Sequence, residues 1–456
     1  MLISIEVDFI VIQLNKDLII SKERKTHMKR LISTILVLIM LMCIRVVFAE
    51  EEAWTLYWMY PYAEEHAICQ TIAKVVAKYQ AEVNPNLVYN PEYISDSEPY
   101  YQKLKILIGS NEAPDMFWGD ADTFTKTLRD QGLLTNIGEI IDELGQRDKF
   151  LPITYQYQQY DDGSLYLMAT GANNEVFFYH PSLFEKAGIE KQPETWDEFF
   201  DVCEKLKAAG ITPLSVMGNP WYILRYAAFM PYRMTGNEWI SKTISGQTSW
   251  GDETGIAMGE FLQKISQYFV DGWAGMDSSA CRDYFLAGSA AMWYMPLSAA
   301  QSAVTGPDNE LIDDIAYFKL PLLDGYTATT EKDYFANSGK GFMINSKTFN
   351  AHPEEIKRFI DFFINNFGDI GLYQCNYICG ILPNNMDDLS SFVKQMYQDF
   401  SEVSPDRYAW CWDVVIDSAS NETLKAEIVN LALGEITPQE FGERMDEAIA
   451  ENVLSE

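Results

Sequence analysis

The sequence predicts an α/β fold, and three observations support this prediction. Short apolar runs alternate with helical patterns early in the chain, a second helix and strand follow near residue 195, and further amphipathic helices occur towards the C-terminus. Such alternation is typical of sheets covered by helices. The chain has 456 residues, of which 48% are hydrophobic and 22% charged, and this length suits about two or three domains.

The clearest alternation lies between residues 53 and 132. Residues 53–60 have strand character, and the helical pattern after them stops at residues 84–86 (NPN). Strands are then predicted at 87–89 and 115–118, each followed by a helix, and the last of these helices ends at Gly132. The helical faces are Ile68, Ile72, Val75, Val76 and Tyr79; Tyr101, Leu104 and Ile108; and Phe124 with Leu128.

Two capping boxes mark later helices. Thr195 and Glu198 precede an apolar pattern that ends at Gly210, and residues 211–214 have strand character. Residues 437–440 (TPQE) combine the second box with Pro at the first helical position. The chain has no internal repeat and no low-complexity linker, so we expect units that share strands. A further helical face is Ile356, Phe359, Ile360 and Phe363.

An export signal is predicted at residues 28–49. A charged start (MKR) is followed by an apolar run and by VFA, the small-residue pattern of a cleavage site, so we expect cleavage after Ala49. A permanent membrane anchor is the alternative. It is disfavoured because the run is shorter than the roughly 20 residues of a spanning helix and Arg45 interrupts it.

Two further expectations concern this end of the chain. We interpret Met28 as the true start and residues 1–27 as an over-called stretch without function. Cys43 is the candidate for a lipid anchor, but it follows Met42 where a small residue is expected. We therefore expect an exported protein on the periplasmic or extracellular face of the membrane, without a lipid on Cys43.

The chain after Ala49 is strongly acidic. It keeps 27 of the 34 basic and 62 of the 66 acidic residues, a net charge of about −35. Such a surface repels nucleic acid and anionic lipid. It also disfavours anionic ligands, because no cluster of Lys or Arg follows the signal. Neutral or cationic solutes remain, although the charge could also serve solubility alone.

The sequence lacks the patterns of common catalytic, cofactor and metal sites. His66, His180 and His352 lie in no catalytic motif, and the chain has no G-x-S-x-G, phosphate loop, C-x-x-C or H-E-x-x-H. We therefore predict no enzyme activity, no cofactor and no metal, although counting acids does not exclude a two-carboxylate glycosidase. We expect mostly buried thiols, and only Cys375 and Cys379 form a local pair. The cysteines after the signal are Cys69, Cys203, Cys281, Cys375, Cys379 and Cys411.

Four stretches, in their order and spacing, resemble the family 1 extracellular solute-binding proteins of carbohydrate ABC importers, a group that includes the maltose-binding protein. The resemblance covers nearly all of the chain after the signal. The stretches are residues 101–104 (YQKL) leading to 113–117 (APDMF), 179–188 (YHPSLFEKAG) with 195–199 (TWDEF), 285–292 (FLAGSAAM) and 339–344 (GKGFMI).

The resemblance implies the two-lobed periplasmic-binding-protein fold. Each lobe would be a mostly parallel sheet flanked by helices, and a multi-segment hinge would let the lobes close over a ligand. The expected segments are 50–172 with 320–375 for the N-lobe, 176–316 with 384–456 for the C-lobe, and 172–176, 315–321 and 376–383 for the hinge.

In the first lobe, the resemblance places aromatic and acidic residues at the cleft. Sugar recognition needs flat apolar faces together with carboxylates and amides in a concave site. Trp118 and Asp120 match the family's cleft loop, and Asp122 follows at a different spacing; the alternative is an ordinary surface loop. The loop after the first strand adds three candidates, of which the first could instead pack beneath the sheet: Trp58, Tyr60 and Glu64.

In the second lobe, Asn219, Trp221 and Tyr222 follow the strand at 211–214, where relatives have an acid, a Pro and a stacking aromatic. Asn219 replaces the acid, so hydroxyl recognition should differ. We expect Trp221 to be the main stacking residue, because Gly218 and Pro220 place it in a loop.

Further candidates lie near the expected crossovers and the last helices. Relatives have a Gly-Trp pair that this chain lacks; either Trp293 or Tyr294 compensates for it, or this subsite is shallower. Trp412, with Trp410 and Asp413, would roof the site unless these tryptophans are core. Two crossover residues could contact a hydroxyl or, alternatively, cap the backbone: Asn174 and Glu175.

These features predict the solute-binding subunit of an ABC importer, which captures a sugar or oligosaccharide and delivers it to a membrane permease. A binder of peptides or polyamines is the first alternative, and a secreted carbohydrate-active enzyme is the second. A polyamine site would need acids around an amine, and a peptide site would need charges for the termini. The aromatic and amide residues of the expected cleft loops favour a sugar.

Overall fold

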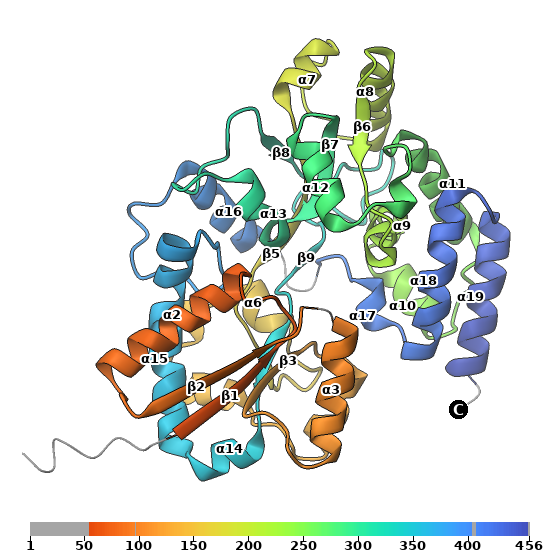
Figure 1. Ribbon diagram of the computed structural model, residues 1–456. Coiled ribbons are helices and arrows are strands. Elements are labelled where there is room, and N and C mark those ends of the chain that lie inside the picture. The colour runs from red at the N-terminus through yellow and green to blue at the C-terminus, as the bar shows by residue number, and fades with distance from the viewer. Residues whose placement is uncertain (1–53, 96, 404–406, 455–456) are drawn as a thin grey trace, which may run out of the picture. The chain divides into compact units, whose positions relative to one another are not determined.

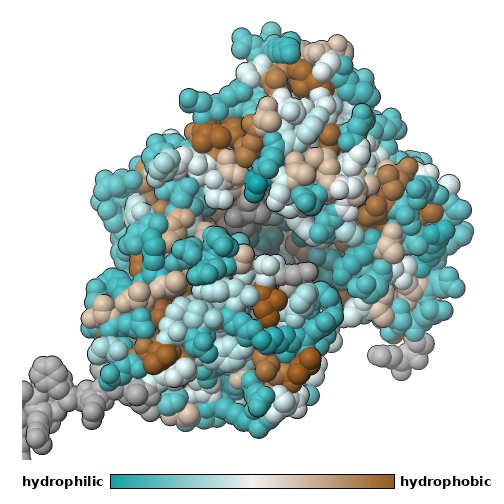
Figure 2. Space-filling view, in the orientation of Figure 1, coloured by the Kyte–Doolittle hydropathy of each residue, from teal (hydrophilic) through white to brown (hydrophobic). Residues whose placement is uncertain are grey.

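The computed structural model describes residues 54–95, 97–403 and 407–454. The predicted signal at 28–49, the expected cleavage after Ala49 and residues 1–27 with Cys43 lie outside the described residues. Within them, two five-stranded mixed sheets are flanked by helices, so the α/β prediction is confirmed (Figure 1). The visible face in Figure 2 is largely hydrophilic, as expected for a sequence with a formal net charge of −32.

The first sheet has the strand order β2-β1-β3-β10-β4. Strand β1 is parallel to β3, whereas β10 is antiparallel to both β3 and β4. Residues Met116–Gly119 of β3 are all buried, because this strand lies in the middle of the sheet. The strands are β1 (Trp54–Tyr60), β2 (Leu87–Tyr93), β3 (Met116–Gly119), β4 (Met168–Ala169) and β10 (Gly341–Ile344).

The second sheet has the order β6-β7-β5-β8, and β9 also pairs with β5. Only β6 and β7 are parallel, since β5 is antiparallel to β7, β8 and β9. The expectation of mostly parallel sheets is therefore wrong in this detail. After forming the strands of the second sheet, the chain returns to the first sheet at β10, which is antiparallel to both of its neighbours. The strands are β5 (Asn173–Tyr179), β6 (Thr212–Ser215), β7 (Ala290–Pro296), β8 (Ala316–Phe318) and β9 (Ala336–Asn337).

The helices follow the predicted alternation, and Figure 1 shows α18 and α19 side by side. The helices up to residue 208 are α2 (Ala67–Glu82), α3 (Ser97–Gly109), α4 (Thr123–Asp130), α5 (Ile137–Glu143), η1 (Arg147–Lys149), α6 (Pro152–Gln156), α7 (Pro181–Lys186) and α8 (Trp196–Ala208). The later helices are α9 (Pro220–Thr235), α10 (Glu238–Ile244), α11 (Glu253–Ile265), η2 (Ser266–Tyr268), η3 (Trp273–Gly275), α12 (Ser278–Leu286), α13 (Leu297–Val304), α14 (Ser346–Ala351), α15 (Pro353–Cys375), α16 (Ser391–Glu402), α17 (Trp412–Val415), α18 (Ser418–Leu433) and α19 (Pro438–Asn452).

Several helix ends form as the sequence predicts. Thr437 and Glu440 make the reciprocal capping box of α19. At α8, the Thr195 side chain accepts from the Glu198 N–H, and the Glu198 carboxylate accepts from the backbone N–H of Glu194. Gly210, just beyond α8, has φ 72°, a left-handed conformation that glycine adopts without strain.

Each sheet has its own aromatic core. Trp58 packs against Trp118, Phe342, Phe359 and Phe363, so α15 covers this face of the first sheet. The second sheet buries a cluster of rings between β5, β7, α8 and α9. Of the six described cysteines, none is paired and only Cys375 is not fully buried, which confirms the prediction of mostly buried thiols.

The chain passes from β4 of the first sheet to β5 of the second near the expected segment 172–176. β5 pairs at its start with β9 and further along with β7 and β8. Residues 315–321 include β8, a strand of the second sheet, and the chain joins the first sheet only at β10. The hinge boundaries and the lobe limits stay predictions.

Candidate functional site

A cavity of about 640 Å³ lies where β3 ends and α9 begins. We call it the Trp221 cavity, and its volume is typical of small-molecule sites. One set of lining residues comes from α3, the loop after β3 and the start of β10, and the other from α9, α17 and α18. The charged, amide and aromatic residues of the lining include Glu98, Tyr101, Lys105, Asp120, Asp122, Phe124, Asn219, Trp221, Lys340, Asp413, Asn421 and Lys425.

Strand register brings Asp120 and Lys340 together in the wall of this cavity. Gly119 at the end of β3 pairs with Gly341 at the start of antiparallel β10, so the residues beyond these ends meet. Lys340 Nζ lies 2.7 Å from Asp120 Oδ2 and donates to the Tyr101 hydroxyl at 3.2 Å. The two charged side chains are 24% and 20% exposed, so the ion pair is part of the cavity surface. Burial raises the pKa of Tyr101 to about 12, while Lys340 opposes that shift.

Asp122 also lines the cavity, and it begins the next helix. Its Oδ1 accepts a hydrogen bond of 2.9 Å from the Thr125 N–H, so it is the N-cap of α4. Burial raises the pKa of Asp122, and the bond from the Thr125 N–H opposes this shift. The carboxylate therefore has a structural role in addition to its place in the cavity.

This raised pKa makes a testable prediction for Asp122→Asn, because asparagine also caps helices well. A carboxylate with a raised folded pKa contributes stability below its unfolded value, about 3.9, and loses it as pH rises through the folded value. The stability of the wild type relative to the variant should therefore fall between pH 4 and pH 7. Melting temperatures of both proteins across this range check the sign, and a difference that grows with pH in favour of the wild type contradicts it.

On the other wall, backbone geometry fixes the position of Trp221. A Cβ at Gly218 would lie 2.1 Å from the Ala274 carbonyl oxygen, so this close approach requires glycine. Asn219 then caps α9, with its Oδ1 accepting from the Trp221 N–H at 3.3 Å. Trp221 is half-buried and lines the cavity, whereas Tyr222, the next residue, is fully buried.

Arg225 lies one helical turn beyond Trp221 and joins two carboxylates. Its Nε is 3.1 Å from Glu175 Oε1 and its Nη1 is 3.2 Å from Asp413 Oδ1. Its guanidinium lies 5.6 Å from the centre of the Trp221 ring, within cation–π range. Arg225 and Glu175 are buried, whereas the Asp413 side chain is 21% exposed and lines the cavity. Burial raises the pKa of Glu175, and Arg225 opposes this shift.

A second cavity of about 420 Å³ adjoins the first, and we call it the Trp410 cavity. The two cavities share Asp120, Asp122, Thr123 and Val414. Trp410 is half-buried. The other aromatic residues of its lining are Tyr157, Tyr160 and Tyr408.

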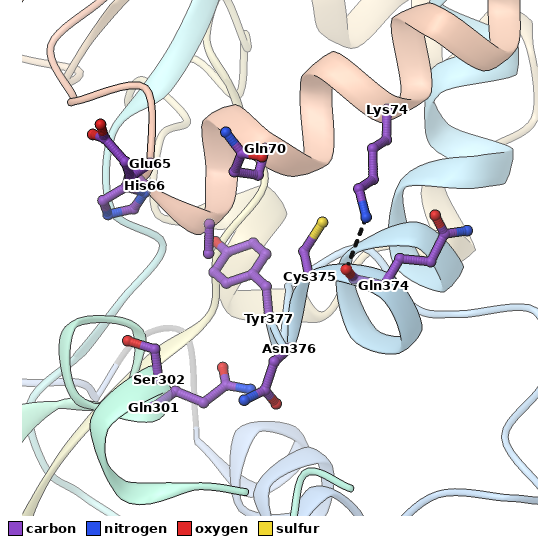
Figure 3. A pocket seen from close by; sticks show the side chains of 11 residues that line it. Glu65, His66, Gln70, Lys74, Gln301, Ser302, Gln374, Cys375, Asn376 and Tyr377 are labelled. Carbon is purple, nitrogen blue, oxygen red and sulfur yellow. Dashed lines mark hydrogen bonds between the residues drawn. The ribbon is translucent and has the colours of Figure 1, made fainter. Parts of the chain in front are cut away.

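A third cavity of about 330 Å³ lies at the start of α2, beside α13 and the end of α15 (Figure 3). Its wall is polar, and Lys74 Nζ donates to the Gln374 carbonyl oxygen at 2.9 Å. Glu65 and His66 line this cavity, whereas the predicted Glu64 is exposed and lines none of the cavities described. Glu64 was therefore not placed correctly, although its neighbour Glu65 lines this third cavity.

Seven predicted site aromatics are fully or almost fully buried in the cores, and this corrects their assignment to a ligand surface. Trp58 and Trp118 pack in the first sheet, where the Tyr60 hydroxyl meets that of Tyr89 at 2.7 Å. Tyr222 donates to the Tyr294 carbonyl oxygen. Trp412 packs against Trp239 and Trp250, so the half-buried tryptophan at this place is Trp410. The corrected residues are Trp58, Tyr60, Trp118, Tyr222, Trp293 and Tyr294, together with Trp412.

The two crossover candidates are also buried. Asn174 lies in β5 and pairs through its backbone with Ala336 of β9, while its amide Nδ2 lies 3.8 Å from the Met396 sulfur. Glu175 is held by Arg225. Neither lines the Trp221 cavity, so the expected hydroxyl contacts are not present here. Of the predicted site residues, this cavity brings together Asp120, Asp122, Asn219 and Trp221.

Sequence reasoning missed most of the charged residues in this cavity. Tyr101 belongs to a stretch that carries the family resemblance, and Lys340 lies between two glycines at a strand entry. The register of β3 and β10 would have paired Lys340 with Asp120. Asp413 was named beside Trp412 as a possible roof of the site, whereas Lys105 and Lys425 come from helices whose distance in space no local pattern gives.

Across residues 54–95, 97–403 and 407–454, no group of three or more His, Cys, Asp or Glu side chains is arranged to hold a metal ion. In the same part of the chain, none of the helices has the length and apolar character needed to cross a membrane.

The family model of bacterial extracellular solute-binding proteins matches residues 63–366, about two thirds of the chain. The chain belongs to this family. As such a solute-binding protein, it is a receptor rather than an enzyme, and the family is extracellular.

The individual relatives are distant. The sn-glycerol-3-phosphate-binding periplasmic protein of Brucella abortus is 27% identical over 88 residues, which is 18% of this chain and 20% of that protein. The chain thus matches only about a fifth of the length of the first curated relatives. Solved structures share the fold of this solute-binding protein over a larger part of its chain than these sequence matches cover.

Two of these structures illustrate the likeness. A chitin oligosaccharide binding protein is 24% identical, with a TM-score of 0.73 over 88% of this chain and 99% of that one. A structure from a study of xylan utilization by Caldanaerobius polysaccharolyticus is 19% identical, with a TM-score of 0.73 over 86% and 99%.

Proposed function

We propose that this solute-binding protein captures a neutral sugar in the Trp221 cavity. One observation carries the proposal: a half-buried indole lines the same cavity as an ion pair and a further carboxylate. Sugar rings have an apolar C–H face that packs on an indole and hydroxyls that both donate and accept. Asp120 can accept from a hydroxyl and Lys340 can donate to one, so the pair suits a polyol.

The charges of the cavity favour a neutral ligand over an anionic one. Three lysines line it, Lys105, Lys340 and Lys425, and Lys340 is already paired with Asp120. The acids that face them are Glu98, Asp120, Asp122 and Asp413. These lysines, together with relatives named for glycerol-3-phosphate, make a phosphorylated polyol the second candidate. An excess of acids would repel its phosphate.

The proposal includes the path of the sugar. The segment 28–49 would export the chain without a lipid on Cys43. The predicted N-lobe and C-lobe would close over the sugar, because sugar binding shifts the equilibrium to a closed form. An ABC importer permease would then receive the sugar from the closed form. The sugar, its length and the permease are parts of this proposal.

A ligand panel tests the function on the chain from residue 50 onward. We expect mono- and oligosaccharides of the right kind to raise the melting temperature, because ligand at 100 times its dissociation constant adds about 2.7 kcal/mol. Glycerol-3-phosphate, short peptides and polyamines should leave it unchanged. A shift with glycerol-3-phosphate alone favours the second candidate, and a panel without any saccharide shift refutes the proposal.

A further inference from the structure

We infer that Lys340 is a specificity-determining residue, which makes the Trp221 cavity reject cationic solutes such as polyamines and sugars that carry an amine in place of a hydroxyl. This inference rests on the proposed function, since it names the solutes that the same site refuses. The acidic sequence leaves both neutral and cationic solutes as candidates, and the position of this one side chain decides between them.

The cavity contains the groups that an amine ligand would need. Asp120 and Asp122 both line it, and Tyr101 lines it with them. Two carboxylates and a phenol are acceptors of the kind that hold an ammonium group. The formal net charge of −32 would also attract cations towards the protein. On these groups alone, the cavity would suit a polyamine or an amino sugar.

Lys340 already occupies the position of such an amine. Its Nζ donates to Asp120 Oδ2 at 2.7 Å and to the Tyr101 hydroxyl at 3.2 Å. Burial alone would lower the pKa of Lys340, but Asp120 and the neighbouring phenols outweigh burial and raise it, so the side chain is charged at neutral pH. The amine among these acceptors is therefore the protein's own.

The backbone holds Lys340 in place from both sides. The Gly339 N–H donates to Asn337 Oδ1 at 2.9 Å, and the Gly339 carbonyl oxygen accepts from Gln158 Nε2 at 2.7 Å. On the other side, Gly341 is paired with both β3 and β4. Since its flanking residues are fixed in this way, the ammonium group is preorganised beside Asp120 before any ligand arrives.

A neutral sugar can bind beside this ion pair. An ammonium group has three N–H donors, of which Lys340 uses two, so the third can donate to a sugar oxygen. A carboxylate has about four acceptor positions, so Asp120 can also accept from a hydroxyl. The pair thus offers a donor and an acceptor to the same polyol.

A ligand ammonium group cannot use the pair in this way. It has no lone pair with which to accept from Lys340. Two cations that each lie within about 3 Å of one carboxylate are also within about 6 Å of each other. Like charges at that separation, at the edge of a protein, weaken binding by roughly 10- to 100-fold. A built-in repulsion of this kind gives specificity against the wrong solute.

Matched pairs of sugars, with an amine in place of a hydroxyl, test this role on the chain from residue 50 onward. Calorimetric titration at pH 6, where the amines are protonated, would compare glucose with glucosamine, galactose with galactosamine, and the β-1,4-linked trimers of glucose and glucosamine. Spermidine is the cation that tests the cavity whichever sugar it takes. In the wild type, the neutral member should bind at least about tenfold more tightly, and spermidine should not bind.

Lys340→Gln keeps a donor but removes the charge. The preference for the neutral sugar should fall to about threefold or less, and spermidine should now bind. Asp120→Asn added to Lys340→Gln should abolish this new binding, because it removes the carboxylate that would hold the amine. Unliganded melting temperatures should change little, since both members of the ion pair are partly exposed. Lys340→Met replaces Lys340→Gln if that variant melts early.

Three control variants separate the position of the charge from the total charge. Lys340→Arg keeps a cation beside Asp120 and should keep the wild-type preference. Lys105 lies over an aromatic ring and Lys425 is paired with a glutamate of its own helix, although both line the cavity. Lys105→Gln and Lys425→Gln should therefore shift both members of a sugar pair together and leave the preference within about twofold of the wild-type value.

The outcomes distinguish this inference from the proposed function. Three results overturn the role of Lys340 and leave sugar capture intact: a wild type that binds both members of a pair alike, no gain of spermidine binding in Lys340→Gln, or an equal gain in Lys105→Gln. Binding of spermidine or amino sugars by the wild type without any neutral saccharide refutes both, and so does the absence of all binding.

Discussion

Trp221→Ala should almost abolish the thermal shift that a saccharide produces, while the melting temperature without ligand stays nearly unchanged. The ring is half-buried at the first turn of α9, where it lines the cavity. Loss of an aromatic anchor of this kind typically costs about 2 kcal/mol or more of binding free energy, so the dissociation constant should become roughly 30 to 100 times larger. At a concentration 100 times the wild-type constant, the stabilisation would fall from about 2.7 to about 1 kcal/mol or less.

A matched tryptophan in the core controls for loss of bulk. Trp412 is buried against Trp239 and Trp250, so Trp412→Ala should lower the unliganded stability by about 3 to 5 kcal/mol. Calorimetry and thermal melts of both variants should therefore show opposite patterns. If Trp221→Ala also lowers the unliganded melt by several kcal/mol, Trp221 is a core residue and our assignment of the cavity wall fails.

Local sequence signals predicted the helices and strands well because their causes are local. The apolar spacing that ends at Gly109 and the capping box at Thr437 need only neighbouring residues to act, and both appear in the structure as α3 and α19. Mixed sheets were not predicted, because strand direction depends on which distant strands pair. The antiparallel entry of β10 beside β3 joins residues more than 200 positions apart.

The candidate site was harder to predict, for two physical reasons. Trp293 lies in a strand that is almost entirely buried, and Trp58 begins the fully buried last three residues of β1, so alternation gives no signal of exposure at either position. Trp410 and Trp412 are separated by one residue, yet only the second is buried. In contrast, Gly218 and Pro220 signalled a break in the chain before Trp221. Trp221 does line a cavity, but it lies in the first turn of α9 and not in the predicted loop. Predicting Lys340 as a site residue would have required the register between β3 and β10.

The buried cation at Arg225 should be a sensitive position for stability. Arg225→Met keeps much of the side chain's volume but leaves Glu175, which is 0% exposed, without its partner. Loss of one member of a buried ion pair typically costs about 3 to 5 kcal/mol, because the remaining charge is unpaired. We therefore expect a large fall in the free energy of unfolding at pH 7, measured by denaturant titration.

The pH dependence of this loss identifies its cause. Loss of Arg225 removes the main effect that opposes burial, so the pKa of Glu175 should rise further. A carboxylate with a raised folded pKa stabilises the fold below its unfolded value, about 4.3, and this contribution is lost as pH rises through the folded pKa. The cost of Arg225→Met should thus be smaller near pH 4.5 than at pH 7.5. A cost that does not change with pH would mean that lost packing, and not the unpaired carboxylate, destabilises the variant.

A double variant separates the buried carboxylate of Glu175 from the carboxylate of Asp413 at the cavity. Glu175→Gln with Arg225→Met removes the buried charges together, so it should recover much of the stability that Arg225→Met alone loses. Saccharide binding should recover less, because Arg225 also contacts the Asp413 carboxylate and lies over the Trp221 ring, and both of these line the cavity. Stability would then be set chiefly by Glu175, and affinity by the hold of Arg225 on Asp413 and Trp221. Full recovery of affinity along with stability would show that Arg225 supports the fold alone and does not position the cavity wall.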